Sequence, residues 1–293
     1  MVLRNPLRAR MLSTTPLRER RLTLNGVVTA ILEGGHGRPI ILLHGAGGFA
    51  AGWLRIVPDL VPRHRVIAPD LPGHGDSSFW TESPDAARLV GWLDDLIDCS
   101  CETAPILVGQ TLGGAIAAAY AAARGERLAA LVLVDALGLA GFQPEPAFGS
   151  ALGAYIAGPS EESHDALMRQ CLFDYPRVQR ELGELWPAFA AYLTDRALAP
   201  DRIAALGALM QHAGITPIPP AHLESISVPT TLIWGRRDRA TPLAVAQRAS
   251  ERYGWPLHVI EDSGDEPPLE QPAAFLGALH AAAAPASARR LAP

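Results

Sequence analysis

The segment Val108-Gly109-Gln110-Thr111-Leu112-Gly113-Gly114 constrains the fold of this chain more than any other, because it describes a sharp turn between a strand and a helix. An apolar run, residues 105–108, precedes the turn, and an alanine-rich stretch, residues 115–123, follows it. Glycines let a strand and a helix pack closely, while the residue between them takes a strained backbone conformation. The segment therefore predicts a strand–turn–helix unit that presents the side chain of Thr111 at the end of the strand.

Short apolar segments and longer helix-forming segments alternate along most of the chain. Strands are expected near residues 21–24, 27–32, 40–43, 65–68, 106–108, 130–134, 231–234 and 257–260. Continuous apolar runs such as Leu131-Val132-Leu133-Val134 are typical of strands that are buried on both faces of a parallel sheet. The sequence therefore predicts the α/β class, with a mostly parallel, doubly wound sheet covered by helices on both sides.

Three further segments follow expected strands and complete a pattern with the turn at Thr111. They are His44-Gly45-Ala46-Gly47-Gly48, Asp70-Leu71-Pro72-Gly73-His74-Gly75-Asp76-Ser77 and the segment 228–238. In this order, the four segments resemble the α/β-hydrolase superfamily over about residues 20–282. The resemblance implies a sheet of the α/β-hydrolase type, with Thr111 at the nucleophile position and Asp238 at the position of the acid. It also implies an oxyanion hole formed by the backbone N–H groups of Ala46 and Leu112.

The segment that resembles the last motif of the family departs from it at one position. Where the family has Gly-His-x-Pro-x-x-Glu-x-Pro, this chain has Gly264-Asp265-Glu266-Pro267-Pro268-Leu269-Glu270-Gln271-Pro272. The resemblance therefore gives a catalytic triad of Thr111, Asp238 and Asp265, which contains no histidine. A carboxyl group has an unperturbed pKa of about 3.9 and an imidazole one of about 6.5, so a carboxylate is the weaker base. Because neighbouring carboxylates repel each other, we expect Asp238 and Asp265 to titrate as a pair.

Four residues of the core motifs are expected to contact a substrate: His44, Gly45, His74 and Gln110. His74 lies in a loop after the carboxyl end of a strand, where open α/β sheets bind their ligands. For His44 and His74 the alternative is a structural role, with hydrogen bonds inside their own loops.

Residues 138–225 interrupt the alternation with a helical segment that is rich in proline and aromatic residues. By its position it resembles the helical cap that members of the family insert over the active site. Its aromatic side chains, Trp186 among them, either line a mainly apolar substrate pocket or pack the cap onto the core. His212 is a polar candidate for orienting a ligand there. The histidines of this segment are also candidates for the missing base: His164, His212 and His222.

The composition excludes several other functions. A formal net charge of −5 provides no basic surface for nucleic acid. No apolar run approaches the roughly 18 residues of a membrane span. No phosphate-binding loop, dinucleotide fingerprint or metal motif is present, so we expect no cofactor and no metal. The three cysteines form no disulfide framework, which favours the cytoplasm. A small apolar molecule is the expected substrate or ligand. The sequence does not determine whether the chain forms an oligomer.

The two ends of the chain differ in composition from the rest. Residues 1–20 are arginine-rich and lack the apolar core of a secretory signal. We expect a disordered leader there, the alternatives being an organelle transit segment or a true start at Met11. Residues 283–293, rich in alanine, proline and arginine, are expected to form a disordered tail. Between these ends we expect two parts: a core of residues 21–137 and 226–282, and an inserted cap of residues 138–225.

Three functions are compatible with these residues. The first is hydrolysis of a small apolar ester, lactone or carbon–carbon bond, in which Thr111 binds or attacks and Asp238 or Asp265 acts on water. The second is a non-hydrolytic reaction, such as that of an isomerase, lyase or cyclase, with the carboxyl groups transferring protons. The third is ligand binding without turnover, as in a catalytically inactive pseudohydrolase. The fold alone does not choose among them, since function resides in the site.

Overall fold

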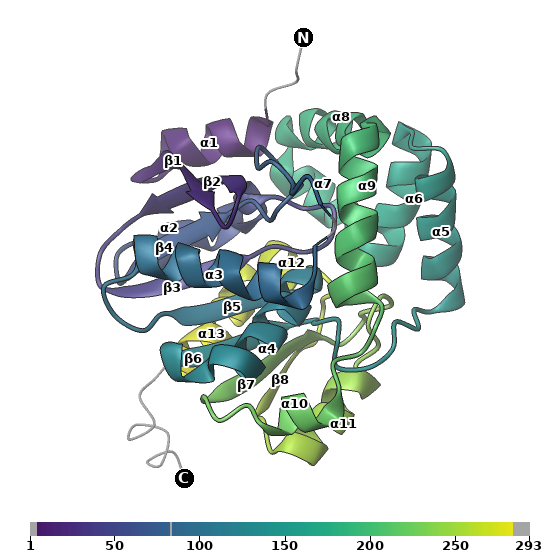
Figure 1. Ribbon diagram of the computed structural model, residues 1–293. Coiled ribbons are helices and arrows are strands. Elements are labelled where there is room, and N and C mark those ends of the chain that lie inside the picture. Colours follow the sequence, from purple (N-terminus) through teal and green to yellow (C-terminus); the bar gives the residue numbers. More distant parts are fainter. Residues whose placement is uncertain (1–4, 83, 284–293) are drawn as a thin grey trace.

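A computed structural model describes residues 5–82 and 84–283, and its centre is a twisted eight-stranded sheet (Figure 1). The strands are β1 (Leu17–Leu24), β2 (Val27–Gly34), β3 (Arg38–Leu43), β4 (His64–Pro69), β5 (Ile106–Gln110), β6 (Ala130–Val134), β7 (Thr230–Gly235) and β8 (Leu257–Ile260). Their order in the sheet is β1-β2-β4-β3-β5-β6-β7-β8. β2 pairs antiparallel with β1 and with β4, and all other pairs are parallel. The predicted α/β class with a mostly parallel sheet is confirmed.

The central strands are apolar on both sides because each side faces its own layer of helices. In β3, Ile41 and Leu43 belong to one hydrophobic cluster, while Ile40 and Leu42 belong to the other. The first cluster lies against α3 (Ala86–Ser100), α4 (Leu112–Arg124), α10 (Pro220–Glu224) and α11 (Ala244–Tyr253). The second lies against α1 (Pro6–Thr14), η1 (Ala50–Arg55), α2 (Val57–Leu60) and α13 (Pro272–Ala283). Alternate side chains of a strand point to opposite faces, so each cluster takes every second residue.

A group of helices fills the segment between β6 and β7 and lies beside the sheet (Figure 1). They are α5 (Pro146–Ala157), α6 (Glu161–Cys171), α7 (Tyr175–Leu182), α8 (Leu185–Leu198) and α9 (Pro200–Leu209), followed by the π-helix η3 (Met210–Gly214). A third hydrophobic cluster joins α5–α8 and extends to Ala240 and Leu269 of the core. We keep residues 138–225 as the proposed extent of a cap.

The N-terminal segment differs from the expected disordered leader. Asn5 caps helix α1 by accepting a hydrogen bond from the N–H of Arg8 at 3.0 Å, and Leu7 and Met11 are each 1 % exposed. These two apolar residues are four positions apart, so they form one buried stripe on the helix. Strand β1 then takes up residues 17–24. Order over residues 5–20 thus rests on a buried stripe and on strand pairing, whereas residues 1–4 lie outside the described part of the chain.

The C-terminal helix α13 includes Ala283, and residues 284–293 of the expected tail lie outside the described residues. In the part of the chain that the structure describes, no helix combines the length and apolarity needed to cross a membrane.

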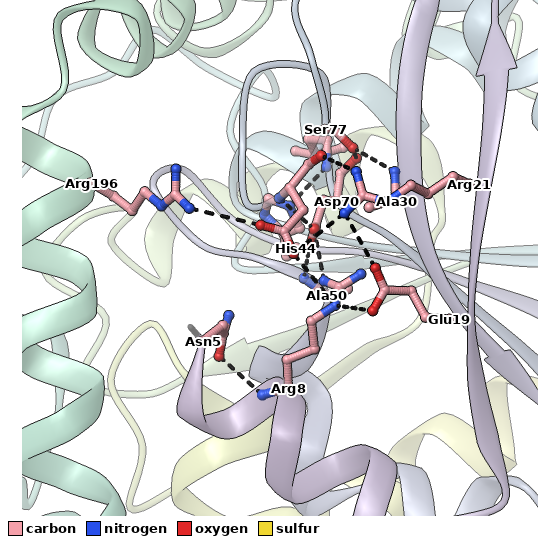
Figure 2. Close-up of polar contacts among 12 residues, drawn as sticks. Asn5, Arg8, Glu19, Arg21, Ala30, His44, Ala50, Asp70, Ser77 and Arg196 are labelled. Atoms are coloured by element: carbon pink, nitrogen blue, oxygen red, sulfur yellow. Dashed lines mark hydrogen bonds and ion pairs between the residues drawn. The ribbon is translucent and has the colours of Figure 1, made fainter. Parts of the chain in front are cut away.

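A buried ion pair fixes helix α1 to the core (Figure 2). Arg8 Nη1 donates to Asp70 Oδ2 at 2.8 Å, and both side chains are almost fully buried. Asp70, in the loop after β4, also accepts the backbone N–H groups of Ala50 at 2.7 Å and Asp76 at 2.9 Å. Helix α1 also contacts η1 and α8, so it lies between the core and the helices that follow β6.

We predict that Arg8→Ala lowers the free energy of unfolding by about 2–4 kcal/mol, because it leaves the Asp70 carboxylate buried without its cation. Urea unfolding followed by circular dichroism measures the change. Arg10→Ala is the matched control, since Arg10 lies on the same helix and is exposed. Equal stability of the two variants would show that the ion pair does not fix α1.

Candidate functional site

The sharp turn at Thr111 is held by backbone hydrogen bonds to two neighbouring segments. Thr111 has φ 43° and ψ −109°, which is a strained conformation for a β-branched residue. Its N–H donates to the carbonyl oxygen of Val134 at 2.9 Å. Its carbonyl oxygen accepts the N–H groups of Ala115 at 3.1 Å and Leu137 at 3.0 Å. The turn is therefore fixed to the end of β6 and to the first turn of α4.

Three glycines around the turn are required by close backbone contacts. A Cβ atom added to Gly109 would lie closer than 3.0 Å to the carbonyl oxygen of Gly113. One added to Gly113 would lie equally close to the carbonyl oxygen of Leu43, and one added to Gly114 would overlap Ala136. Strands β3, β5 and β6 and helix α4 thus meet at distances that only glycine allows, as the sequence predicts.

The loop after β3 lies directly against Thr111. The N–H of Ala46 donates to Thr111 Oγ1 at 3.3 Å. A Cβ added to Gly45 would lie closer than 3.0 Å to the same oxygen atom. Leu112 is the first residue of α4, where N–H groups have no carbonyl partner within the helix. The hydroxyl group therefore lies between the loop and the positive end of a helix.

Three aspartates follow the carboxyl ends of the neighbouring strands and are buried. Asp135 follows β6, Asp238 follows β7 and Asp265 follows β8, and they are 0 %, 3 % and 8 % exposed. Asp238 Oδ1 accepts the N–H groups of Ala240 and Thr241, both at 2.8 Å. Burial nevertheless raises the pKa of Asp238 to about 8. Burial, with the nearby charge of Asp238, raises the pKa of Asp265 well above its usual value.

Gln110 ties the loop after β8 to the turn. Its Nε2 donates to the carbonyl oxygen of Asp265 at 2.9 Å and to Glu266 Oε2 at 2.8 Å. The N–H of Asp265 donates to the carbonyl oxygen of Cys171 at 3.0 Å, which joins the loop to cap helix α6. The side-chain amide of Gln110, expected to contact a substrate, is thus engaged within the protein. Burial raises the pKa of Glu266 to about 7, although the Gln110 hydrogen bond opposes the change.

Sequence reasoning gave no catalytic role to three acids of this region, and it did not name Asp135 at all. Asp135 directly follows a predicted strand at the same sheet edge, a position that it shares with many aspartates of ordinary turns. Glu266 lies next to Asp265. Glu270 accepts the N–H groups of Gly264 at 2.7 Å and Phe173 at 2.6 Å, which fixes the loop after β8 to the cap. Within the described residues, no group of three or more His, Cys, Asp or Glu side chains is arranged to hold a metal ion.

The histidines of the core motifs have structural positions. His44 Nε2 accepts the N–H of Leu71 at 2.9 Å, so Nδ1 carries the proton and donates to the carbonyl oxygen of Gly45 at 2.8 Å. Burial lowers the pKa of His44 to about 4. His74 Nδ1 lies 3.1 Å from the carbonyl oxygen of Pro72, and burial lowers its pKa to about 3. Both imidazoles are neutral near pH 7. Their hydrogen bonds lie within the loops, which agrees with a structural role rather than with contact to a substrate.

The candidate residues of the cap do not contact the acids at the sheet edge. His212 is exposed in η3. Trp186 is 5 % exposed and packs edge-to-face against Tyr175 and Phe189, with ring centroids at 5.3 Å and 5.5 Å. His164 is buried beside Trp186, at a centroid distance of 6.1 Å. In the described part of the chain, no histidine forms a hydrogen bond with Thr111, Asp238 or Asp265.

Comparison with known proteins identifies the family. A model of the "Alpha/beta hydrolase family" matches residues 40–278. The 2-hydroxy-6-oxo-2,4-heptadienoate hydrolase of Pseudomonas putida is 28 % identical over 282 residues, covering 88 % of this chain and 93 % of that protein. The dihydrolipoyllysine-residue acetyltransferase component of the acetoin cleaving system of Pseudomonas putida is also 28 % identical, over 250 residues, and the chain spans only 65 % of its length.

Solved structures give the same result. A membrane phospholipase A, described as a bacterial virulence factor, has a TM-score of 0.79 and 26 % identity, with 98 % of this chain and 91 % of that chain covered. A mutant of the meta-cleavage product hydrolase CumD from Pseudomonas fluorescens has a TM-score of 0.74 and 25 % identity, covering 87 % of this chain and 94 % of that chain. The similar proteins thus include a hydrolase of meta-cleavage products and a membrane phospholipase A.

We predict that Gly45→Ala lowers the free energy of unfolding by about 1–3 kcal/mol, because its methyl group overlaps Thr111 Oγ1. The cost should fall below about 1 kcal/mol when Thr111→Ala removes that oxygen, and a double-mutant cycle measures the difference. Gly52→Ala serves as the control, since an added Cβ there has no neighbour within 4 Å. An identical cost in both backgrounds would contradict the contact.

Proposed function

Because the chain belongs to the alpha/beta hydrolase family, we propose that it hydrolyses a small apolar ester, lactone or carbon–carbon bond substrate. The proposed site consists of Thr111, Asp238 and Asp265. One observation carries the proposal: the Thr111 hydroxyl lies at a strand–helix turn, 3.3 Å from the N–H of Ala46, where the family resemblance places the nucleophile. Acids occupy the ends of the neighbouring strands, where the remaining members of a triad are expected.

The N–H groups of Ala46 and Leu112 form the proposed oxyanion hole. Ala46 already donates toward the site, and Leu112 adds the first N–H of helix α4. Preorganised donors of this kind stabilise the negative charge that develops on a carbonyl oxygen, and one such donor is worth about 3–4 kcal/mol in the transition state.

The acids determine how water is activated. Near pH 7 the Asp238 carboxyl group, with its pKa of about 8, is mostly protonated and therefore donates rather than accepts protons. As pH rises through that value it becomes a carboxylate, which takes a proton from water while the oxygen of that water attacks the carbonyl carbon. The same proton then passes to the leaving group, which restores the carboxylate. In this scheme Thr111 positions the substrate through its hydroxyl group.

The relatives support the substrate class. Two curated relatives are named as hydrolases of 2-hydroxy-6-oxo-dienoates, and one structural neighbour is a membrane phospholipase A. These names cover carbon–carbon and ester bonds, and either reaction places negative charge on an oxygen atom. We propose the cytoplasm as the location, on the strength of the three free cysteines, Cys99, Cys101 and Cys171.

A second candidate is favoured by the raised pKa values of the acids. Carboxyl groups that keep their protons near pH 7 are suited to the proton transfers of an isomerase, lyase or cyclase, with the oxyanion hole holding an enolate. A pseudohydrolase that only binds ligand is the remaining alternative.

Hydrolysis of p-nitrophenyl esters of short to medium chain length by the wild type and by Thr111→Ala separates these functions. We predict turnover above buffer that survives in the variant at a reduced rate, because the acids rather than Thr111 activate water. Loss of turnover in Thr111→Ala would identify Thr111 as a nucleophile instead. Turnover in neither protein would contradict the esterase proposal and favour the second candidate.

Replacing Asp265, which stands where the family motif has histidine, tests the same site by supplying a stronger base. We predict that Asp265→His raises kcat/KM on these esters about 10-fold or more near pH 7.5, because imidazole is the stronger base at that pH. Asp262→His is the matched control, since Asp262 is exposed in the same loop. A folded Asp265→His variant with unchanged activity would indicate a cavity built for other chemistry.

A further inference from the structure

Asp135 is fixed between the turn at Thr111 and strand β7. It has φ 44°, a conformation that few residues other than glycine adopt and that aspartate adopts more often than most. Its N–H donates to the carbonyl oxygen of Ile233 at 3.1 Å, and its Oδ1 accepts the N–H of Gly235 at 2.8 Å. Val134, just before it, and Leu137, two residues after it, form hydrogen bonds with the backbone of Thr111. Asp135 thus belongs to the same rigid unit as the candidate site.

Two neighbouring buried acids each have one carboxyl oxygen without a hydrogen-bond donor. Asp135 Oδ2 and Asp238 Oδ2 are both buried and have no conventional donor among the described residues. The other oxygen of each carboxyl group is already occupied by backbone N–H groups. The two side chains are near enough for a hydrogen bond between them. Two carboxylate oxygens are both acceptors, so such a bond requires that one acid keep its proton.

The surroundings favour retention of that proton. Asp265 and Glu266 face Asp135 from the loop after β8, and Glu145, at the start of α5, acts on Asp238. The buried thiol of Cys171, at the end of α6, lies near both Asp238 and Asp265. Added negative charge and burial each disfavour ionisation, and Asp135 is the more deeply buried of the pair. Accordingly, the pKa of Asp135 is raised well above its usual value, and its contact with Asp238 opposes the rise in the pKa of Asp238.

We propose that Asp135 is a positioning residue that stays protonated and donates its O–H to Asp238 Oδ2, which makes Asp238 the member of the pair that ionises. This deepens the proposed function, on which it rests, because it defines the acid that exchanges a proton with water. When Asp238 takes that proton, its charge passes to the attacking oxygen and Asp135 keeps its own proton. When the proton moves on to the leaving group, the pair returns to one proton and one negative charge.

The pair also explains why Asp238 can hold a charge in an acid-rich site. Two backbone N–H groups stabilise Asp238 Oδ1, and the Asp135 O–H stabilises Oδ2. Asp265 has a free Oδ1 that receives no such donor, and burial with its acidic neighbours raises its pKa well above the usual value. The charge is therefore directed to one carboxyl group.

The test is a pH titration by NMR of protein labelled with ¹³C at the aspartate carboxyl carbons, with Asp238→Asn used to assign the Asp238 signal. Asp135→Asn preserves both contacts, because the amide oxygen accepts the Gly235 N–H and the amide nitrogen donates to Asp238. We predict that Asp135→Asn keeps the Asp238 midpoint within about 0.5 pH of the wild type. Asp135→Leu removes the donor and should raise that midpoint by about 1 pH or more. Asp262→Asn, at an exposed position, should change neither value.

Two results would overturn the proposal. A fall of the Asp238 midpoint by about 2 pH or more in Asp135→Asn would mean that Asp135 carries the charge itself. An unchanged midpoint in Asp135→Leu would mean that no donation takes place. If Asp135→Leu does not fold, the wild-type signal of Asp135 decides: retention of its proton beyond pH 9 supports the proposal, and ionisation below pH 6 contradicts it. None of these readouts depends on turnover, so failure of the hydrolase proposal would be seen separately.

Discussion

The close packing of strands β3, β5 and β6 against helix α4 at the turn of Thr111 determines where every other part of the site lies. Side chains at Gly109, Gly113 and Gly114 would overlap backbone or Cβ atoms, so these three positions set the approach of the helix to the sheet. That approach forces Thr111 to φ 43° and brings the loop of Ala46 onto its hydroxyl group. Because parallel strands end at one edge, the loops after β6, β7 and β8 deliver their acids to the same place.

Gathering acids at that edge has an electrostatic cost that the protein meets by keeping protons. Asp135, Asp238 and Asp265 are buried at this edge, Glu266 directly follows Asp265, and Glu270 ends the short helix α12 (Pro267–Glu270). Elsewhere the chain neutralises buried carboxylates with arginine, as Arg8 does for Asp70 (Figure 2). At the sheet edge, backbone N–H groups take that role instead. A site of this kind favours chemistry in which a carboxyl group, rather than an imidazole, holds and releases the proton.

The sequence could predict the fold because its signals are local and periodic: the apolar strands and the glycines of the turn. Helix α1 was missed, since its buried stripe and its ion pair need partners far along the chain, such as Asp70, about 60 residues from Arg8. The engagement of Gln110 depends likewise on the loop after β8. Asp135 was missed for a different reason: an aspartate after a strand is common in turns, and only burial beside Asp238 distinguishes it.

The pH dependence of stability tests the central claim, that the site is built on buried acids that keep their protons. The folded state retains protons that the unfolded chain releases at pH 7 to 8.5, so unfolding releases protons in this window and the free energy of unfolding falls as pH rises. The histidines with lowered pKa act mainly below about pH 7, so between pH 7.0 and 8.5 they oppose the effect only slightly. Urea unfolding at pH 7.0 and 8.5 should give a fall of more than about 1 kcal/mol, as expected for the Asp238 pKa of about 8 alone. Stability that is unchanged or rises over this range would contradict the account.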